Sequence, residues 1–127
     1  MEISSYTKDH LDGVIDLSIA EGWTSFAESP ERAHRALVAP GVTTVVAVSD
    51  GSVIGFAQLQ SDGEIQAHLS LLVVSRGHRR HGIGRQLLQK AFEKGGATRI
   101  DLLTDSANEF YESLPHKTFH GYRLYLS

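Results

Sequence analysis

The segment Leu69–Leu88 reads LSLLVVSRGHRRHGIGRQLL, an apolar run followed by a basic loop and then by an amphipathic pattern. The run Leu71–Val74 predicts a strand, and the residues after Gly82 and Gly84 repeat with the spacing of a helix. A helix that begins with glycines leaves several backbone N–H groups unshielded at the positive end of its dipole. Such a helix start binds phosphate, and four arginines between positions 76 and 85 add charge-assisted contacts to a polyphosphate.

Two familiar phosphate loops do not fit this segment. The dinucleotide-binding fingerprint needs a third glycine where Leu87 stands, and the nucleoside-triphosphate loop needs a Gly-Lys-Ser/Thr sequence that is absent. What remains is Arg79-x-x-Gly82-x-Gly84 after an apolar strand. A solvated basic loop is the simpler alternative, and the glycines favour the phosphate-binding interpretation over it.

Strand and helix patterns alternate along the rest of the chain, with no repeat, linker or domain boundary. Asp9 is the expected N-cap of the first helix and Gly22 its stop, while Ser29-Pro30 begins the second helix. Asp50-Gly51 and Asp62-Gly63 are expected turns between three antiparallel strands. The expected elements are strands at 2–6, 42–48, 52–57, 64–74 and 99–103, helices at 11–19, 30–38, 82–94 and 106–114, and a last strand or hairpin at 118–126.

Composition describes one ordinary globular domain over residues 1–127. Of these residues 41% are hydrophobic and 21% charged, and a chain of this length buries a single core. It has no cysteine, which excludes disulfides, thiolate metal sites and a cysteine nucleophile. Its longest apolar run, Leu71–Val74, is too short to span a membrane, so we expect a cytoplasmic protein.

The Arg79–Gly84 motif, with a strand before it and a helix after it, resembles the acetyl-CoA loop (Arg/Gln-x-x-Gly-x-Gly/Ala) of the GNAT superfamily of N-acetyltransferases. The inferred order β-α-α-β-β-β-α-β-α-β is also that family's order, so the resemblance covers nearly the whole chain. It implies an α/β (α+β) fold with a mixed, mainly antiparallel central sheet flanked by helices. It also implies acetyl transfer from acetyl-CoA to a primary amine by direct nucleophilic attack, without a metal.

The resemblance also implies where the cofactor binds. The backbone of Leu72 and Val74 pairs with the pantetheine arm, and the amides of the loop, with Arg85 at the helix start, hold the pyrophosphate. The family's usual asparagine seven residues before its tyrosine is replaced by Thr104, which leaves Asn108 as a substitute. The implied cofactor-binding residues are Leu72, Val73, Val74, Arg79, Arg80, His81, Gly82, Ile83, Gly84, Arg85 and Asn108.

Two catalytic roles are assigned on the same basis. Phe110-Tyr111 resembles the family's Phe/Leu-Tyr pair, which makes the Tyr111 hydroxyl the proton donor to the departing thiolate. A backbone N–H near Val74 stabilises the oxyanion. A tyrosine that packs with its hydroxyl at the surface is the structural alternative.

The resemblance also implies His68 as the general base, because some members of the family have a catalytic Glu or His at this position, eleven residues before Arg79 on the strand that enters the loop. Period-two alternation places it with Ser70, Leu72 and Val74 on one face, and an imidazole suits proton transfer at neutral pH. Glu64 is a competing base, and a water chain or a purely structural role for His68 stays open.

The acceptor amine is expected at the loop between the first two helices, where acidic and aromatic residues suit a cation. These residues are Glu21, Trp23, Phe26 and Glu28. Core or oligomer contacts are the alternative for Trp23 and Phe26. The chain is short for the family, so its acceptor-site walls are either incomplete or completed by a second subunit in a homodimer. The identity of the amine stays open.

Three competing interpretations remain. The pair His78 and His81, together with His68, His116 and His120, suggests a metal site, but the arginines around the pair repel a dication and no carboxylate is adjacent. A nucleic-acid-binding module is disfavoured by the net charge of −3 and by the lack of aromatic residues among the arginines. A non-catalytic CoA-binding sensor stays open, because the family's Gly-Phe after the tyrosine is missing.

Overall fold

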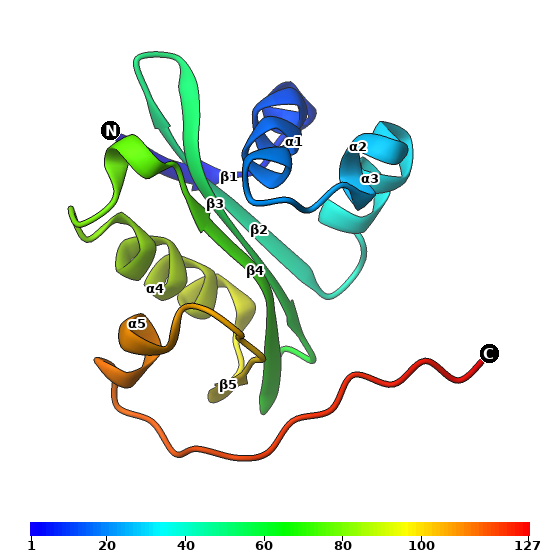
Figure 1. Cartoon of the computed structure of the whole chain (residues 1–127), viewed down its shortest axis with the longest axis vertical. Helices are drawn as coiled ribbons and strands as arrows, with labels where there is room; N and C mark the ends of the chain where they lie inside the picture. Colours follow the sequence, from blue (N-terminus) through cyan, green and yellow to red (C-terminus); the bar gives the residue numbers. More distant parts are fainter.

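A five-stranded sheet in the order β1-β2-β3-β4-β5 forms the centre of the computed structural model, which describes all residues 1–127. Helices cover both faces, with α1, α2 and α3 on one side and α4 and α5 on the other (Figure 1). The elements are β1 (Glu2–Ser5), α1 (Leu11–Ala20), α2 (Ser25–Glu28), α3 (Pro30–Leu37), β2 (Val42–Ser49), β3 (Ser52–Ser61), β4 (Gln66–Val74), α4 (Ile83–Gly95), β5 (Arg99–Asp101) and α5 (Asn108–Glu112), with 3₁₀ turns η1 (Lys8–His10) and η2 (Arg76–His78).

The pairing of the strands confirms the mixed, mainly antiparallel sheet. Strands β1 to β4 are antiparallel neighbours, and β5 runs parallel to β4 after the crossover through α4. The turn between β2 and β3 has positive φ at both Asp50 (50°) and Gly51 (78°), as a two-residue hairpin turn requires. The Asp-Gly signal therefore identified the turn correctly.

Two hydrophobic clusters hold the helices on the sheet, one on each face. Val45, Leu59 and Leu87 belong to the cluster under α4, and none of them is accessible to solvent. Phe56 and Leu37 belong to the cluster under α1 and α3 and are equally buried. None of the helices is both long enough and apolar enough to cross a membrane.

The ends of the first helices agree with the sequence at two points and differ at a third. Ser29 caps α3 by accepting the Arg32 N–H at 3.4 Å, and Gly22, with φ of 81°, follows the last turn of α1. The expected N-cap Asp9 is wrong, because the turn η1 precedes α1. Thr7 begins that turn and donates its N–H to Nδ1 of His10 at 2.9 Å.

The C-terminal strand expected at 118–126 does not form. Both β5 and α5 are shorter than predicted, and residues 113–127 contain neither helix nor strand. The chain after α5 leaves the body of the protein and ends far from that helix (Figure 1). A strand pattern needs a neighbouring strand to satisfy its backbone, and these residues lie beside none.

Candidate functional site

Strands β4 and β5 diverge beside the basic loop. Strand β4 pairs with β3 over nearly its whole length, but its pairing with β5 covers only Gln66, Ala67 and His68. The edge of β4 from Leu69 to Val74 therefore has no strand partner on the β5 side. Backbone groups at such an edge are available to the amides of an extended ligand. This open edge contains Leu72, Val73 and Val74, the three strand residues that are predicted from the sequence to bind the cofactor.

A β-bulge changes which way the side chains of β4 point. In the pairing with β3, Gln58 stands opposite Leu71 and Leu59 opposite Leu69, so Ser70 is an extra residue. Before the bulge, Leu69 packs in the cluster under α4. After it, even-numbered residues such as Leu72 pack against that cluster. A single extra residue has thus exchanged the two faces of the strand.

The bulge corrects the expected position of His68. Ala67 and Leu69, the residues on either side of His68, point toward α4. The side chain of His68 therefore points to the opposite face of the sheet, which carries α1 and α3. Its register partner on β3 is Gln60, which donates to Oγ of Ser70 at 2.8 Å. His68 therefore shares a face with Ser70 as expected, but not with Leu72 and Val74.

Asp101, a residue that the sequence did not single out, stands next to His68. It is the register partner of His68 on β5, and paired residues of neighbouring strands share a face. Both side chains are exposed. The competing base Glu64 lies in the turn before β4, where its N–H donates to Oδ1 of Asp62 at 2.8 Å. Glu64 is thus at the end of β4 that is farther from the Arg79–Gly84 loop.

The loop before α4 presents a row of free backbone donors. The six consecutive N–H groups from Arg80 to Arg85 donate to no backbone carbonyl. Arg80 and Gly82 both have left-handed backbone conformations, with φ of 68° and 77°. Gly82 is the N-cap of α4 and provides no side-chain cap. Alternating conformations of this kind line up N–H groups into a concave site for an anion, at the positive end of the dipole of α4.

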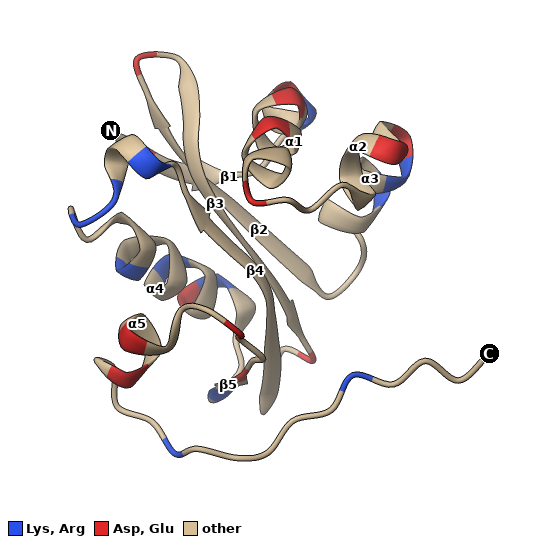
Figure 2. Cartoon of the chain, in the orientation of Figure 1, with Lys and Arg blue, Asp and Glu red and all other residues tan.

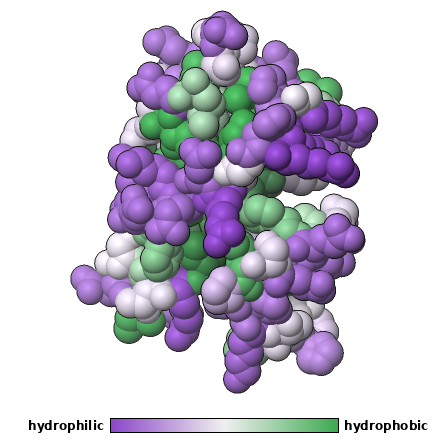
Figure 3. Space-filling view, turned by 90° about the vertical axis from the view of Figure 1, so that its left-hand side faces the viewer, coloured by the Kyte–Doolittle hydropathy of each residue, from purple (hydrophilic) through white to green (hydrophobic).

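Charge reinforces this anion site. Arg76, Arg80 and Arg85 are exposed, and no acidic side chain lies within salt-bridge distance of any of them. Blue stretches of the ribbon mark basic residues on the loop and on α4 in Figure 2, whereas α5 carries red, acidic residues. The donors and arginines present here fit the pyrophosphate of CoA, and the open edge of β4 fits its extended arm. The face that includes α4 is mostly hydrophilic, with smaller apolar areas (Figure 3).

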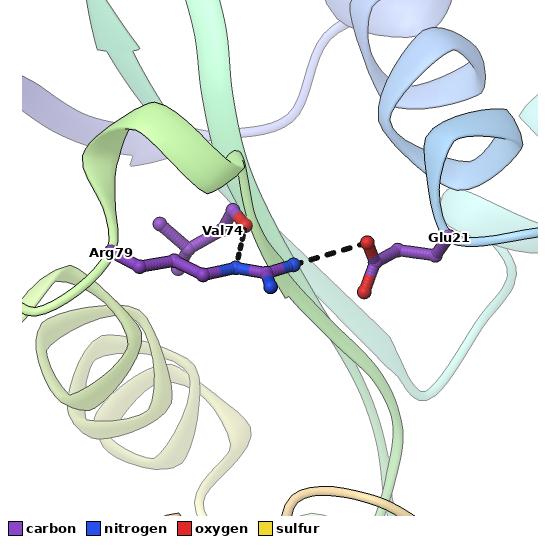
Figure 4. A network of polar contacts seen from close by, with 3 residues as sticks. All are labelled: Glu21, Val74 and Arg79. Carbon is purple, nitrogen blue, oxygen red and sulfur yellow. Dashed lines mark hydrogen bonds and ion pairs between the residues drawn. The ribbon is translucent and has the colours of Figure 1, made fainter.

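Arg79 has a different role from the other three arginines. Its Nε donates to the carbonyl of Val74 at 2.9 Å, and its Nη2 donates to Oε2 of Glu21 at 3.0 Å (Figure 4). The side chain thus ties the loop to the end of β4 and to the C-terminal end of α1. The two residues are 58 positions apart in the sequence, and no local pattern predicts such a contact.

The four residues expected at the acceptor site separate into two groups. Glu21 faces the Arg79–Gly84 loop through its ion pair with Arg79, and Trp23 follows α1 with 40% of its surface exposed. Glu28 accepts a long hydrogen bond from Thr24 at 3.5 Å. Phe26 packs against the cluster under α1 and α3. It therefore makes a core contact, which is the alternative to a role in the acceptor site. Glu21, Trp23 and Glu28 are therefore the members with accessible side chains.

Tyr111 lies half-buried on α5, against the cluster under α4. Its ring meets the edge of Phe110 with centroids 5.0 Å apart, and burial raises the pKa of the Tyr111 hydroxyl above its usual value. That hydroxyl forms no hydrogen bond within the chain, and no buried side-chain polar atom lacks a partner, so it opens to solvent. Asn108 is exposed at the start of α5, and Thr104 accepts the Ala107 N–H at 3.1 Å.

The histidines of the loop form internal contacts. Nδ1 of His78 lies 2.7 Å from Oγ of Ser75, and Nδ1 of His81 lies 3.2 Å from the carbonyl of His78. These bonds close the turn η2 onto the residues that follow it. No three His, Asp or Glu side chains gather into a group that would hold a metal ion.

Comparison with known proteins identifies a family and a fold. A family model described as an acetyltransferase (GNAT) domain matches residues 40–114. An aminoglycoside antibiotic 6'-N-acetyltransferase from Acinetobacter haemolyticus has a similar structure, with a TM-score of 0.80 and 17% identity over 100% of this chain and 98% of its own. No curated protein sequence matches.

Two further structures share the architecture. An aminoglycoside N-acetyltransferase in complex with CoA has a TM-score of 0.78 and 18% identity, with 99% of this chain and 98% of its own covered. An acetyltransferase from Trypanosoma brucei has a TM-score of 0.73 and 21% identity, with the same coverage of 99% and 98%. At these identities the likeness concerns the fold.

Proposed function

Because this chain belongs to the GNAT acetyltransferase family, we propose that it transfers the acetyl group of acetyl-CoA to a primary amine by direct attack. The single observation that carries the proposal is the run of six free N–H groups from Arg80 to Arg85, next to the open edge of β4. The first feature suits a pyrophosphate and the second an amide-containing arm. Acetyl-CoA joins these two groups in one molecule.

The cofactor is held by backbone more than by side chains in this proposal. The N–H groups at the start of α4 bind the pyrophosphate, and Arg80 and Arg85 add charge beside it. The edge from Leu72 to Val74 pairs with the pantetheine arm. The Val74 carbonyl is occupied by Arg79, so the remaining N–H and C=O groups of this edge make those bonds.

Tyr111 is the proton donor of the proposed reaction. A neutral amine attacks the thioester carbonyl, a tetrahedral oxyanion forms, and its collapse breaks the C–S bond. The hydroxyl then protonates the departing sulfur. Burial raises the pKa of Tyr111, which keeps this hydroxyl protonated at neutral pH.

His68 is the proposed base that accepts the proton lost by the amine, directly or through water. It lies on the sheet face that carries α1 and α3, the same side as the loop that follows α1. Glu64 lies in the turn before β4, and its backbone is engaged with Asp62. The position of His68 therefore suits an amine bound near α1 better than the position of Glu64 does.

The acceptor is proposed to be a cationic amine bound near the end of α1. Glu21 and Glu28 supply negative charge there, and Trp23 supplies an exposed aromatic face. Two of the structural neighbours are aminoglycoside acetyltransferases, so aminoglycosides belong in the first panel of acceptors together with polyamines and lysine peptides.

The test separates cofactor binding from catalysis. Calorimetric titration with acetyl-CoA is expected to show micromolar binding by the wild type and at least tenfold weaker binding by Arg80→Gln/Arg85→Gln. Lys94→Gln, at the far end of α4, is the matched charge control. A thiol-release assay with the amine panel then measures turnover. Binding without turnover on any amine would assign the chain as a CoA-binding sensor, and no binding by folded protein would reject the cofactor site itself.

A further inference from the structure

Helix α5, which carries Tyr111, is attached to the body of the protein by side-chain packing alone. It lies beside α4 (Figure 1), yet no hydrogen bond or ion pair joins residues 105–114 to any residue before Thr104. None of the five residues of the helix is buried. The position of α5, and with it the position of Tyr111, therefore depends on a few apolar contacts.

The ring of Phe110 makes the contact between α5 and the start of α4. A β-carbon on Gly84 would lie 3.6 and 3.7 Å from two carbons of this ring, and 3.7 Å from Cγ2 of Val74. These are ordinary distances for atoms in contact. The ring therefore packs on the bare backbone of Gly84, beside the end of β4.

Gly84 belongs to the anion site as well. Its N–H is one of the six from Arg80 to Arg85 that donate to no backbone carbonyl. Unlike Gly82, it has no positive φ, so its backbone conformation does not require a glycine. What the missing side chain provides is room for the Phe110 ring. The anion site and α5 are therefore both fixed relative to the same residue.

The orientation of Tyr111 follows from that of Phe110. The two adjacent rings meet edge to face, with planes at 79° and centroids 5.0 Å apart, an arrangement that aromatic pairs favour. The ring of Tyr111 also packs against the cluster under α4, which includes Ile83 and Leu87. Two aromatic side chains thus hold α5 from two directions. Without the Phe110 ring, one of these two contacts is lost.

We propose that Phe110 is the positioning residue for Tyr111, because its ring, packed on Gly84, sets the distance between the Tyr111 hydroxyl and the anion site. This inference rests on the proposed acetyl transfer. A hydroxyl that is fixed relative to the pyrophosphate is also fixed relative to the sulfur at the other end of the pantetheine arm. A displacement of about 1 Å costs about 10²-fold in rate. Phe110 has no polar side-chain atom and acts only through Tyr111.

The first test separates kcat from KM. Phe110→Ala is expected to lower kcat by about 10- to 100-fold and to change the KM for acetyl-CoA by less than about threefold. Phe110→Leu fills most of the same space and is expected to recover most of the loss. Phe92→Ala is the matched control, because it removes another partly exposed ring about 12 Å further along α4 and should leave kcat unchanged. A loss confined to KM would overturn the proposal.

A double substitution tests whether Phe110 acts through Tyr111. In the Tyr111→Phe background there is no hydroxyl to position, so the addition of Phe110→Ala is expected to lower kcat by less than about threefold further. Two losses that simply multiply would contradict the positioning role, because they would show that Phe110 acts independently of the hydroxyl.

NMR provides a measurement that needs no acceptor. In spectra of ¹³C-tyrosine-labelled protein, Tyr111→Phe identifies the Tyr111 signal. Burial raises the pKa of Tyr111 in the wild type, and in Phe110→Ala this pKa is expected to fall toward its usual value as the ring becomes exposed. Phe110→Leu should keep the raised pKa. An unchanged titration in Phe110→Ala would overturn the proposal, whereas a wild type without turnover on any amine rejects the proposed function instead.

Bulk at position 84 should have the same effect from the opposite side of the contact. Gly84→Val keeps the N–H that faces the anion but adds methyl groups where the Phe110 ring lies. It is expected to displace α5, to lower the pKa of Tyr111 toward its usual value and to reduce kcat more than Gly84→Ala does. Equal kcat values and equal Tyr111 titrations in the two variants would show that the contact does not position the hydroxyl.

Discussion

The guanidinium of Arg79 connects the loop before α4 to the end of α1, with Nη2 at 3.0 Å from Oε2 of Glu21. The same group holds the Val74 carbonyl at 2.9 Å, where β4 ends. One side chain therefore links the proposed cofactor loop, the open strand edge and the proposed acceptor loop. A change at either end of the pair is expected to affect both substrates.

The Glu21–Arg79 pair is best tested by a double-mutant cycle with Glu21→Gln and Arg79→Gln. Both side chains are partly exposed, 26% for Glu21 and 44% for Arg79, so the coupling in unfolding free energy is expected to be at most about 1 kcal/mol. The KM for a cationic amine is expected to rise several-fold in Glu21→Gln. Steady-state kinetics and denaturant unfolding measure the two effects. Unchanged KM values for amine and acetyl-CoA in both variants would show that the pair is only structural.

Gly82 is expected to be required for its backbone conformation. Its φ of 77° disfavours any other residue by about 1–2 kcal/mol, so Gly82→Ala should shift the N–H groups and weaken CoA binding about tenfold. Gly77→Ala is the matched control in the same loop, since Gly77 has no positive φ and no atom lies near its missing β-carbon. Calorimetry compares the two. Equal affinities would place the pyrophosphate elsewhere.

Removal of the Tyr111 hydroxyl is expected to slow the chemical step. Tyr111→Phe keeps the ring against Phe110 and should lower kcat by about 10²- to 10⁴-fold with little change in KM. Because burial raises the pKa of Tyr111, activity that depends on its protonated form persists to high pH and is lost only above about pH 10. A pH profile of kcat checks this, and an alkaline decline that is the same in Tyr111→Phe would assign the decline to another group.

The two candidate bases are distinguished by parallel substitutions. His68→Ala is expected to lower kcat/KM, whereas Glu64→Gln should leave it unchanged, because Glu64 lies in the turn before β4. Asp101→Asn tests whether the neighbour of His68 supports it. The opposite pattern, a loss confined to Glu64→Gln, would exchange the two assignments.

Asp62 is expected to stabilise the turn between β3 and β4 in a pH-dependent way. Its carboxylate accepts N–H groups from Ile65 at 2.7 Å, from Glu64 at 2.8 Å and from Gln66, and these bonds lower its pKa. A lowered pKa in the folded state contributes stability that is present above about pH 4 and is lost as the pH falls below that value. Asp62→Ala should lower Tm at pH 7, and its difference from the wild type should shrink in acid.

Local patterns predicted the elements whose causes are local. The turn at Asp50-Gly51, the cap at Ser29 and the glycine loop before α4 each depend on residues that are adjacent in the sequence. The fold class and family followed from these features and their order. The residues from Arg80 to Arg85 were singled out for the same reason.

The features that the sequence did not predict depend on distant partners. The bulge at Ser70 depends on how β4 aligns with β3, so alternation alone gave the wrong face for His68 relative to Leu72. The contact between Glu21 and Arg79 joins segments 58 positions apart. The strand expected at 118–126 has a correct pattern and no partner within the chain.

The bulge at Ser70 adds one residue to β4 relative to β3, so the two parts of the strand keep their faces without strict alternation between them. Removal of Ser70 would restore plain alternation from Leu69 to Leu71 and would leave His68 on the face opposite Leu72 and Val74, where it is now. The sheet therefore tolerates a one-residue deletion at this point of the strand. The proposed base and the cofactor edge keep their faces with or without the extra residue.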